Sequence, residues 1–460
     1  MVFAVTGMAN LVTAFAINSM TLALPGLERE FGVSQAAVSW LAIVYPLIPC
    51  CTLLIFGRTA ELFGYKRQFG AGFLFFGAVC LAAPLLSRNI GGLIFFRCLQ
   101  GLGYSVMISI TQAIVSRAFP ESERGRALGV NSVFVSVGLA AGPTVGGFLL
   151  TYFSWRALFY FNVPFCLFGF WAVSRFLPED VRGDSGNKKA RRMDVIGALL
   201  FSVSVGVIVL ALNFGDSWGF LSVSFIGCAA GGVLGLAAFV RYETAAKSPM
   251  MNLRLFRDKT FSLANAVCLI SYTAQQLFTY LMPFYLINML SLGSSPAGLI
   301  MLANPIMMMV FSPLGGGIAD KKGTRLPVGA GLGLFCAACL VMGFFGGACL
   351  FAVAIVTLVL VGVGNGLSVP AINTAILGAA PPEHVGVASG MLATMRNLGQ
   401  TLGSTCGVVM LTLRQPAYGV FPPREAYLFA QRDAFFFGLF ALLAALALLA
   451  LLPAKPALKA

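Results

Sequence analysis

The segment GRTAELFGYKR at residues 57–67 recurs in outline as GGIADKKGTR at residues 316–325. In each copy one glycine precedes an acid by four residues, a second glycine follows the acid by three, and a base follows it by five. The matching positions are Gly57, Glu61, Gly64 and Lys66 (with Arg67 beside it) in the first copy, and Gly316, Asp320, Gly323 and Arg325 in the second. Both copies separate long apolar runs, so the pattern indicates an internally duplicated membrane protein.

The composition of the chain also indicates a membrane protein. Its 460 residues are 58% hydrophobic and 10% charged, whereas a soluble domain carries about 25% charged residues. Fourteen apolar stretches reach the length of about 17–25 residues that crosses a bilayer. They lie near residues 3–24, 37–57, 69–86, 91–116, 127–151, 157–177, 195–214, 220–240, 261–289, 296–318, 327–346, 349–373, 387–412 and 434–453.

The net charge of +14 is distributed unevenly over the loops. If the N-terminus is cytoplasmic, most Lys and Arg residues fall in loops on the cytoplasmic side. The loops on the other side hold Arg29, Arg88, Arg156, Arg414, Arg424 and Arg432. This asymmetry follows the positive-inside rule. We therefore expect a multi-pass protein of the inner cell membrane with both termini cytoplasmic, in contact with lipid and not with nucleic acid.

A charged segment at residues 179–194 separates six predicted spans from the next eight. Residues 195–240 carry a single charge, Asp216, and are long enough for two helices. The expected fold is therefore all-α, with two pseudo-symmetric six-helix bundles. We place the first bundle at residues 1–178, a basic linker with two inserted helices at residues 179–260, and the second bundle at residues 261–460.

Evenly spaced glycines give a second match between the halves. The number of residues between Gly125 and Gly386 also separates three other pairs of glycines. These pairs are Gly138 with Gly399, Gly142 with Gly403, and Gly146 with Gly407. Glycines four residues apart form a flat helix face that lets another backbone approach closely. The first segment also contains Pro143, which is expected to kink its helix, and Gly147. Ser404 stands in place of the proline in the second half.

The paired segments around Glu61 and Asp320 resemble the loop signature of the major facilitator superfamily. The segment Arg97-Cys98-Leu99-Gln100-Gly101-Leu102-Gly103 resembles the RxxQGxG motif of the fourth helix in that family, and residues 138–147 resemble its GxxxGPxxGG motif, which is associated with exporters and antiporters. Ala23-Leu24-Pro25, Trp40, Tyr45 and Arg396-Asn397-Leu398-Gly399 are similar to the fourteen-helix drug:proton antiporters. The resemblance covers essentially the whole chain.

The resemblance implies an exporter of small organic molecules that uses the proton gradient and no cofactor. It also implies that the segments around Glu61 and Asp320 form a cytoplasmic latch, in which an acid lying just after a helix accepts from the N-terminus of a neighbouring helix. The alternative is a charged loop that only sets topology. We find no ATP-binding loop, catalytic motif or metal-ligand spacing, so we expect a protein that is not an enzyme and binds no metal. We also expect a monomer.

Two arginines, Arg97 and Arg396, lie inside predicted spans. A charge at the centre of a membrane helix costs about 2.5–3.5 kcal/mol, and such residues usually face a cavity or a partner. The resemblance implies that Arg97 and Gln100 act in coupling or substrate contact. The alternative is an arginine that is satisfied by backbone carbonyls.

Polar residues in the spans are candidates for lining a substrate cavity. Tyr272, Gln275, Gln276 and Tyr280 have the spacing of one helix face. The other candidates are Asn18, Trp40, Tyr45, Tyr104, Asn131, Asn304, Asn365, Asn373 and Gln400. For each of them, hydrogen bonding between helices is the alternative.

None of the 16 acids falls near the centre of a predicted span. Proton antiport requires a group that changes its protonation between access states, usually a carboxylate or histidine. The sequence therefore leaves three functions open: a proton-coupled exporter, an organic-anion or metabolite carrier or uniporter without proton antiport, and a membrane sensor that transports nothing. Arg97 and Arg396 favour a neutral, zwitterionic or anionic ligand over a dication.

Overall fold

A computed structural model describes residues 2–177, 194–219, 222–246, 253–292, 294–348, 350–418 and 421–452, and these residues form helices and short connections without a strand. The α-helices are α1 (Val2–Phe31), α2 (Gln35–Phe63), α3 (Tyr65–Leu86), α4 (Ile90–Ala118), α5 (Arg124–Tyr152), α6 (Arg156–Tyr160), α7 (Asn162–Phe176), α8 (Val195–Trp218), α9 (Val223–Ala245), α10 (Lys259–Phe284), α11 (Ser294–Met301), α12 (Ala303–Lys322), α13 (Arg325–Phe345), α14 (Phe351–Ala379), α15 (Val385–Ala417) and α16 (Pro423–Ala450). The predicted all-α fold is confirmed.

Each of the predicted spans contains helix among the described residues, and twelve candidate spans are long and apolar enough to cross a membrane. Two predicted spans each consist of two consecutive helices, α6 with α7 and α11 with α12. Helices α10 and α15 are not among the twelve. Both contain clusters of polar residues, such as Gln275-Gln276 in α10 and Arg396-Asn397 in α15, which lower their average hydropathy.

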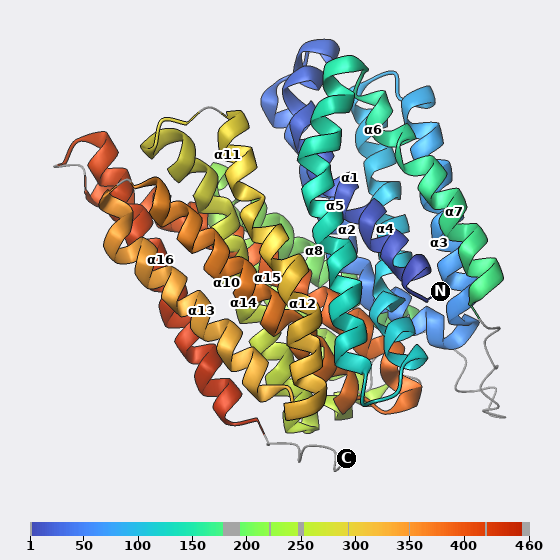
Figure 1. Ribbon diagram of the computed structural model, residues 1–460. Coiled ribbons are helices and arrows are strands. Elements are labelled where there is room, and N and C mark those ends of the chain that lie inside the picture. Colours follow the sequence, from blue (N-terminus) through green and yellow to red (C-terminus); the bar gives the residue numbers. More distant parts are fainter. Residues whose placement is uncertain are drawn as a thin grey trace.

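The helices form two groups, seen on the right and left of Figure 1. In the first group, α1 packs on α5, α2 packs on α4, and α3 packs on α4 and α7. In the second group, α10 packs on α15 and α16, α12 packs on α14, and α13 packs on α14 and α16. We call α1–α7 the first group and α10–α16 the second group. Helices α8 and α9 pack on each other, and α8 also contacts α2 and α15. Most of the predicted linker at residues 179–194 lies outside the described residues.

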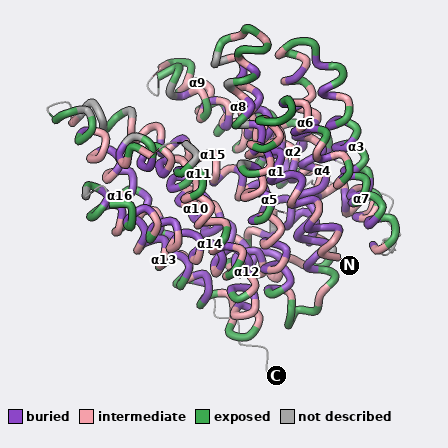
Figure 2. The backbone as a smooth tube through the Cα atoms, turned by 45° about the horizontal axis from the view of Figure 1, so that its top comes forward, coloured by how far each residue is buried: buried purple, intermediate pink, exposed green. Residues whose placement is uncertain are grey.

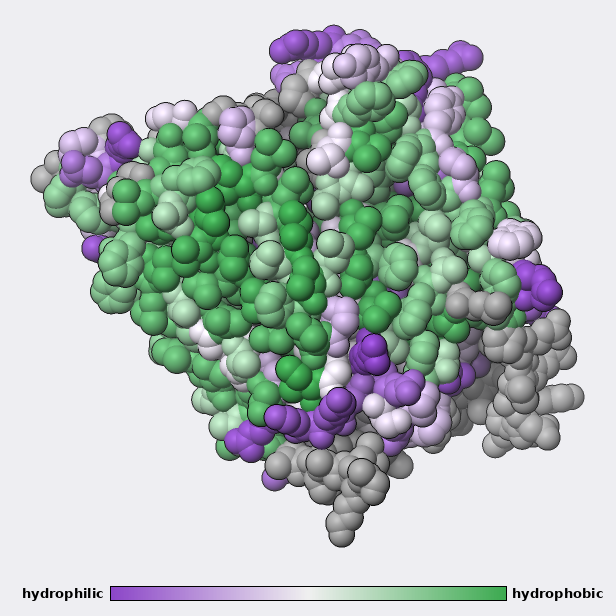
Figure 3. Space-filling view, in the orientation of Figure 1, coloured by the Kyte–Doolittle hydropathy of each residue, from purple (hydrophilic) through white to green (hydrophobic). Residues whose placement is uncertain are grey.

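Burial follows this arrangement. Buried residues lie on the sides of the helices that face their neighbours, and exposed residues lie on the outer sides (Figure 2). Many exposed side chains are large and apolar, for example Phe95, Phe148 and Phe344. On the face shown in Figure 3, a broad hydrophobic surface covers the middle of the molecule, and hydrophilic residues gather toward its ends. An apolar belt of this kind suits a lipid environment.

The two groups meet mainly along two pairs of helices, α5 with α12 and α2 with α15. Figure 1 shows the two groups close together at the end of the molecule where α12 ends and α13 begins. The groups diverge toward the opposite end. The short segments that were matched in the sequence lie at the joined end, because α2 and α12 both finish there.

Candidate functional site

Two acids connect the groups by capping helices of the opposite group. The Glu61 carboxylate, in the last turn of α2, accepts from the backbone N–H of Val387 at 2.8 Å, at the start of α15. The Asp320 carboxylate, in the last turn of α12, accepts from the N–H groups of Gly125 at 2.6 Å and Arg126 at 2.8 Å, at the start of α5. A helix N-terminus carries partial positive charge and unpaired N–H groups, which suit a carboxylate. We call this end of the molecule the contact end.

The acids lie inside helices, which corrects the prediction that they follow a helix. The apolar run ends before the helix does, so hydropathy placed the boundary too early. Each helix stops instead at a glycine with positive φ, Gly64 (φ +100) and Gly323 (φ +82), because this conformation is strained for other residues. The helical extension matters, since it carries the acid to the neighbouring helix.

Close backbone contact brings the acids within reach. A Cβ placed on Gly57 would lie 2.7 Å from the carbonyl oxygen of Gly386 in α15, and a Cβ on Gly316 would collide with the carbonyl oxygen of Gly125 in α5. The glycines that precede the two acids therefore occupy equivalent helix crossings. The duplication proposed from sequence is visible here as two equivalent contacts, α2 on α15 and α12 on α5.

The predicted basic residues differ in their surroundings. Arg67 is exposed, Lys66 is partly buried, and Arg325 donates to the carbonyl of Ala450 at 3.0 Å, at the end of α16. Sequence analysis missed Arg58, whose Nη1 lies 3.0 Å from Glu61 Oε2. Its position three residues before the acid, on the same helix face, was the available signal.

A third contact at this end was also missed. Arg117, in the last turn of α4, donates from Nη2 to the carbonyl of Pro382 at 2.9 Å. Its guanidinium lies 4.3 Å from the centre of the Tyr65 ring. Arg117 and Tyr65 both lie far from Pro382 in the sequence, so no local sequence pattern indicated this contact between the groups.

The two glycine faces pack in equivalent ways within their own groups. A Cβ on Gly138 would lie 2.8 Å from Ala14 Cβ, and one on Gly142 would lie 2.5 Å from Asn18 Cβ, both in α1. In the second group the corresponding neighbours lie in α10: Tyr272 beside Gly399, Gln276 beside Gly403, and Tyr280 beside Gly407. Gly146 lies beside Ser19, whereas a Cβ on Gly147 would meet nothing within 4 Å. The side chain of Pro143 lies outside the described part of the structure.

Arg97 is buried inside the first group, with 2% of its surface exposed. Its Nε donates to the Leu41 carbonyl at 3.1 Å, and its Nη1 to Gln100 Oε1 at 2.5 Å. Both Nη atoms also approach the Ala16 carbonyl, at 3.4 and 3.5 Å. The guanidinium lies 4.3 Å from the centre of the Tyr45 ring. The sequence left open whether Arg97 acts in coupling or substrate contact or is satisfied by backbone carbonyls. The observed geometry is that of the second alternative.

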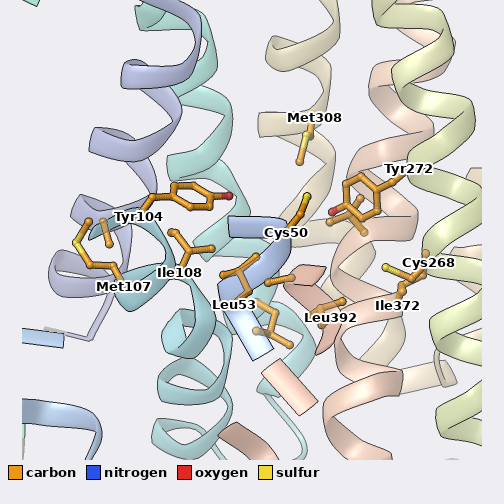
Figure 4. Packing of buried hydrophobic residues seen from close by; sticks show 14 of the residues in the cluster. Cys50, Leu53, Tyr104, Met107, Ile108, Cys268, Tyr272, Met308, Ile372 and Leu392 are labelled. Carbon is orange, nitrogen blue, oxygen red and sulfur yellow. The ribbon is translucent and has the colours of Figure 1, made fainter. Parts of the chain in front are cut away.

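Arg396 lies between the groups and has few partners. It is only partly buried, and its Nη2 donates to the Tyr104 hydroxyl of α4 at 3.4 Å. The ionisable side chains that act on it most strongly are Tyr104, Tyr272 and Cys268. The Tyr45 and Tyr104 rings meet edge to face with centres 5.6 Å apart. Figure 4 shows Tyr104 and Tyr272 extending toward one another, Tyr104 from the first group and Tyr272 from the second.

The other predicted cavity residues are dispersed. Trp40 packs on Phe214 of α8, with ring centres 4.9 Å apart, and Asn18 donates to the carbonyl of Leu139 at 3.1 Å. Gln275, Gln276, Tyr280, Asn304 and Gln400 are partly buried, and Asn373 is buried. Asn131 and Asn365 are fully buried, and neither side-chain amide has a hydrogen-bond partner among the described residues.

The sequence model of the protein family described as Major Facilitator Superfamily matches residues 6–404 of the chain. The multidrug resistance protein Stp of Mycobacterium tuberculosis (strain CDC 1551 / Oshkosh) is 34% identical over 385 residues, which cover 84% of this chain and 70% of Stp. The riboflavin transporter RibZ of Clostridioides difficile (strain 630) is 29% identical over 386 residues, covering 84% of this chain and 82% of RibZ. The tetracenomycin C resistance and export protein of Streptomyces glaucescens is 28% identical over 417 residues, covering 90% of this chain and 76% of that protein.

Solved structures support the same fold. The crystal structure of the human organic anion transporter MFSD10 aligns with a TM-score of 0.68 at 16% identity, covering 96% of this chain and 98% of that one. The proton:xylose symporter XylE aligns with a TM-score of 0.64 at 14% identity, covering 98% and 96%. At these identities the likeness concerns the fold alone.

Proposed function

The chain belongs to the Major Facilitator Superfamily, and from that premise we propose that it is a secondary transporter that exports a small organic molecule by alternating access. The proposal includes the fourteen-span topology of the drug:proton antiporter branch, in which α10 and α15 also cross the membrane. It extends to this chain what the names of Stp and the tetracenomycin C exporter say of those proteins.

The observation that carries the proposal is the pair of equivalent acid–helix contacts at the contact end. Glu61 and Asp320 each join one group to a helix start of the other group, while Arg396 and Tyr104 meet across the groups at greater depth. A molecule held near Arg396 can leave through the contact end only when both acid contacts break. The contacts therefore have the properties of a latch on one of two access states.

We assign the contact end to the cytoplasm of a cell with an inner membrane, with both chain termini on that side, because the positive-inside rule applies to the loops there. In this orientation the structure corresponds to the state that is closed toward the cytoplasm. Export then requires a cycle in which the contact end opens, binds cargo, and closes again.

The coupling ion that we propose is the proton, exchanged at a carboxylate near a membrane boundary. Asp433 and Glu28 are the candidates. Asp433 Oδ2 accepts from Arg414 Nε and from the Tyr418 hydroxyl, both at 2.7 Å, so the carboxylate takes part in a contact between α16 and the end of α15. The alternative, carriage without proton antiport, is favoured by the absence of an acid near the centre of any predicted span.

Transport by the purified protein in liposomes tests the function. The compounds are riboflavin, ethidium and a set of organic anions, each with an imposed pH gradient, with and without a membrane potential. We expect uptake of at least one compound that protein-free liposomes do not show, and accumulation that follows the pH gradient. Movement that only equilibrates the compound indicates the carrier alternative. Saturable binding without movement of any compound contradicts the proposed function.

A further inference from the structure

Arg396 differs from the other intramembrane arginine in what surrounds its charge. Arg97 donates to two backbone carbonyls and one amide oxygen and lies against the face of Tyr45. Arg396 is bonded to two tyrosine side chains, at a long 3.4 Å to the Tyr104 hydroxyl, and to Tyr272. A guanidinium has five N–H donors, so most of the donors of Arg396 have no acceptor among the residues that the structure describes.

No acid of the described residues pairs with Arg396. Its ionisable neighbours, Tyr104, Tyr272 and Cys268, are neutral in their ordinary state at neutral pH. An uncompensated charge in a membrane interior is costly, and a guanidinium suits carboxylate, sulfonate and phosphate groups in particular. The described residues around Arg396 therefore supply a positive charge and hydroxyl groups that suit an anion, and no carboxylate that would compensate the charge.

The position of Arg396 places that charge in the path of a cargo. It follows Val387, at the contact end, by nine residues on the same helix, which corresponds to about 14 Å along the helix axis. This is roughly half of the ~30 Å hydrocarbon core, too deep for the headgroup of a membrane lipid. Tyr104 belongs to the first group, and Tyr272 and Arg396 belong to the second, so a molecule bound here contacts both groups.

The neighbouring glycine fixes Tyr272 beside the charge. Gly399 lies three residues after Arg396 in α15, and a Cβ on it would lie 2.9 Å from Tyr272 Cβ and 2.7 Å from the Leu269 carbonyl. Helix α10 can therefore approach α15 closely at this level. The side chains of Tyr272 and Tyr104 extend toward one another from opposite groups (Figure 4), and both act on Arg396, so both rings can contact a molecule held by the cation.

We propose that Arg396, Tyr104 and Tyr272 form a binding site for the anionic group of a small aromatic anion. The guanidinium and the two hydroxyls hold the carboxylate, sulfonate or phosphate, and the tyrosine rings contact the aromatic part. That this anion is the transported molecule rests on the proposed function. The anion site itself does not depend on transport.

Binding of three probes that share one ring and differ in charge tests the site. They are 2-naphthoate, 2-naphthamide and 2-naphthylmethylammonium, added to the full-length protein in neutral detergent at neutral pH and followed by calorimetry. We expect naphthoate to bind at least about tenfold more tightly than the amide, since charge-assisted hydrogen bonds are the stronger ones. Arg396→Gln should remove this preference, and Arg396→Lys should retain part of it.

Arg88→Gln is the matched control, because it removes an arginine from an exposed position outside the proposed site. It should bind naphthoate as the wild type does. The thermal stability of Arg396→Gln should stay close to that of the wild type, because the partners lost are two tyrosine side chains, one of them at a long 3.4 Å. Three results each overturn the anion site: no binding of naphthoate to the wild type, a preference for the amide or the ammonium, or unchanged naphthoate binding by Arg396→Gln.

Liposomes that contain the same variants separate the site from the proposed function. Naphthoate that binds at Arg396 but is never moved leaves the anion site standing and contradicts transport. Movement of neutral or cationic compounds but not naphthoate, at equal rates in the wild type and Arg396→Gln, supports transport and contradicts the assignment of the anion as the transported molecule.

Discussion

The acid contacts at Glu61 and Asp320 share one plan but hold their carboxylates differently. Asp320 uses both oxygens, each on one backbone N–H of α5. Glu61 uses one oxygen on the N–H of Val387 and the other on Arg58 of its own helix. The close helix crossing is therefore present in both halves, but the second carboxylate oxygen binds a backbone N–H in one half and an arginine in the other. The two contacts should therefore respond unequally to the same chemical change.

The largest effect is expected from Gly316→Ala, which changes the helix crossing itself. The new Cβ would collide with the carbonyl of Gly125. Backbone of this kind cannot move aside as a flexible side chain can, so α5 and α12 must separate. We expect the contact end to open in nearly all molecules and transport to be lost. Spin labels at the exposed positions Ser122 and Lys321, one in each group, would report the separation as a longer distance.

Gly317→Ala is the control for this change, because a Cβ there would meet nothing within 4 Å and the residue is in the same helix. It should keep the distance and the transport rate of the wild type. The labels should be carried by noncanonical amino acids, since the chain has 11 cysteines of its own. A wild-type distance in Gly316→Ala would show that the crossing tolerates a methyl group and that the groups are not held by backbone contact.

Asp320→Asn should have the second-largest effect. An amide has one acceptor oxygen, so one of the N–H groups of Gly125 and Arg126 would face the donor side of the new side chain. Hydrogen bonds to a charged group contribute about 1.5–3 kcal/mol each. We therefore expect the closed population of the contact end to fall about tenfold or more relative to the open one, measured with the same pair of labels. An unchanged distance distribution would mean that Asp320 does not hold the closed state.

Local patterns in the sequence predicted much of this contact end. The spacing of Gly57, Glu61 and Gly64 identified the duplicated segment, and the charge of the acid predicted a helix N-terminus as its partner, which the hydrogen bond to Val387 confirms. The error concerned where α2 ends, because apolar content falls before helical hydrogen bonding does. In this membrane protein the positive φ of Gly64 was the better mark of the helix end.

Partners that come from distant parts of the chain could not be predicted. The surroundings of Arg97 depend on the carbonyls of Ala16 and Leu41, and every residue type presents such a carbonyl, so the sequence held no trace of them. The same holds for Arg117 and Pro382. The contrast between Arg97 and Arg396 therefore required coordinates, although both arginines were identified as unusual from their position in apolar spans.

Glu61→Gln should have the smallest effect of the three, and this follows from its single bond to the opposite group. The Gln oxygen can still accept from Val387, so the hydrogen bond remains while the charge near the helix N-terminus is lost, a difference of about 0.3–1 kcal/mol. The carboxylate is nearly buried, with 6% of its side chain exposed, and an amide avoids part of the cost of burying a charge.

The expected shift in Glu61→Gln toward the open contact end is therefore about two- to fivefold, and Arg58→Gln, which leaves the bond to Val387 in place, should shift it less. If Glu61→Gln opens the contact end as far as Asp320→Asn does, the ion pair with Arg58 must be what positions the acid. In that case the partner of the second oxygen matters more than the number of N–H groups bound, and the two halves hold the contact end closed by different means.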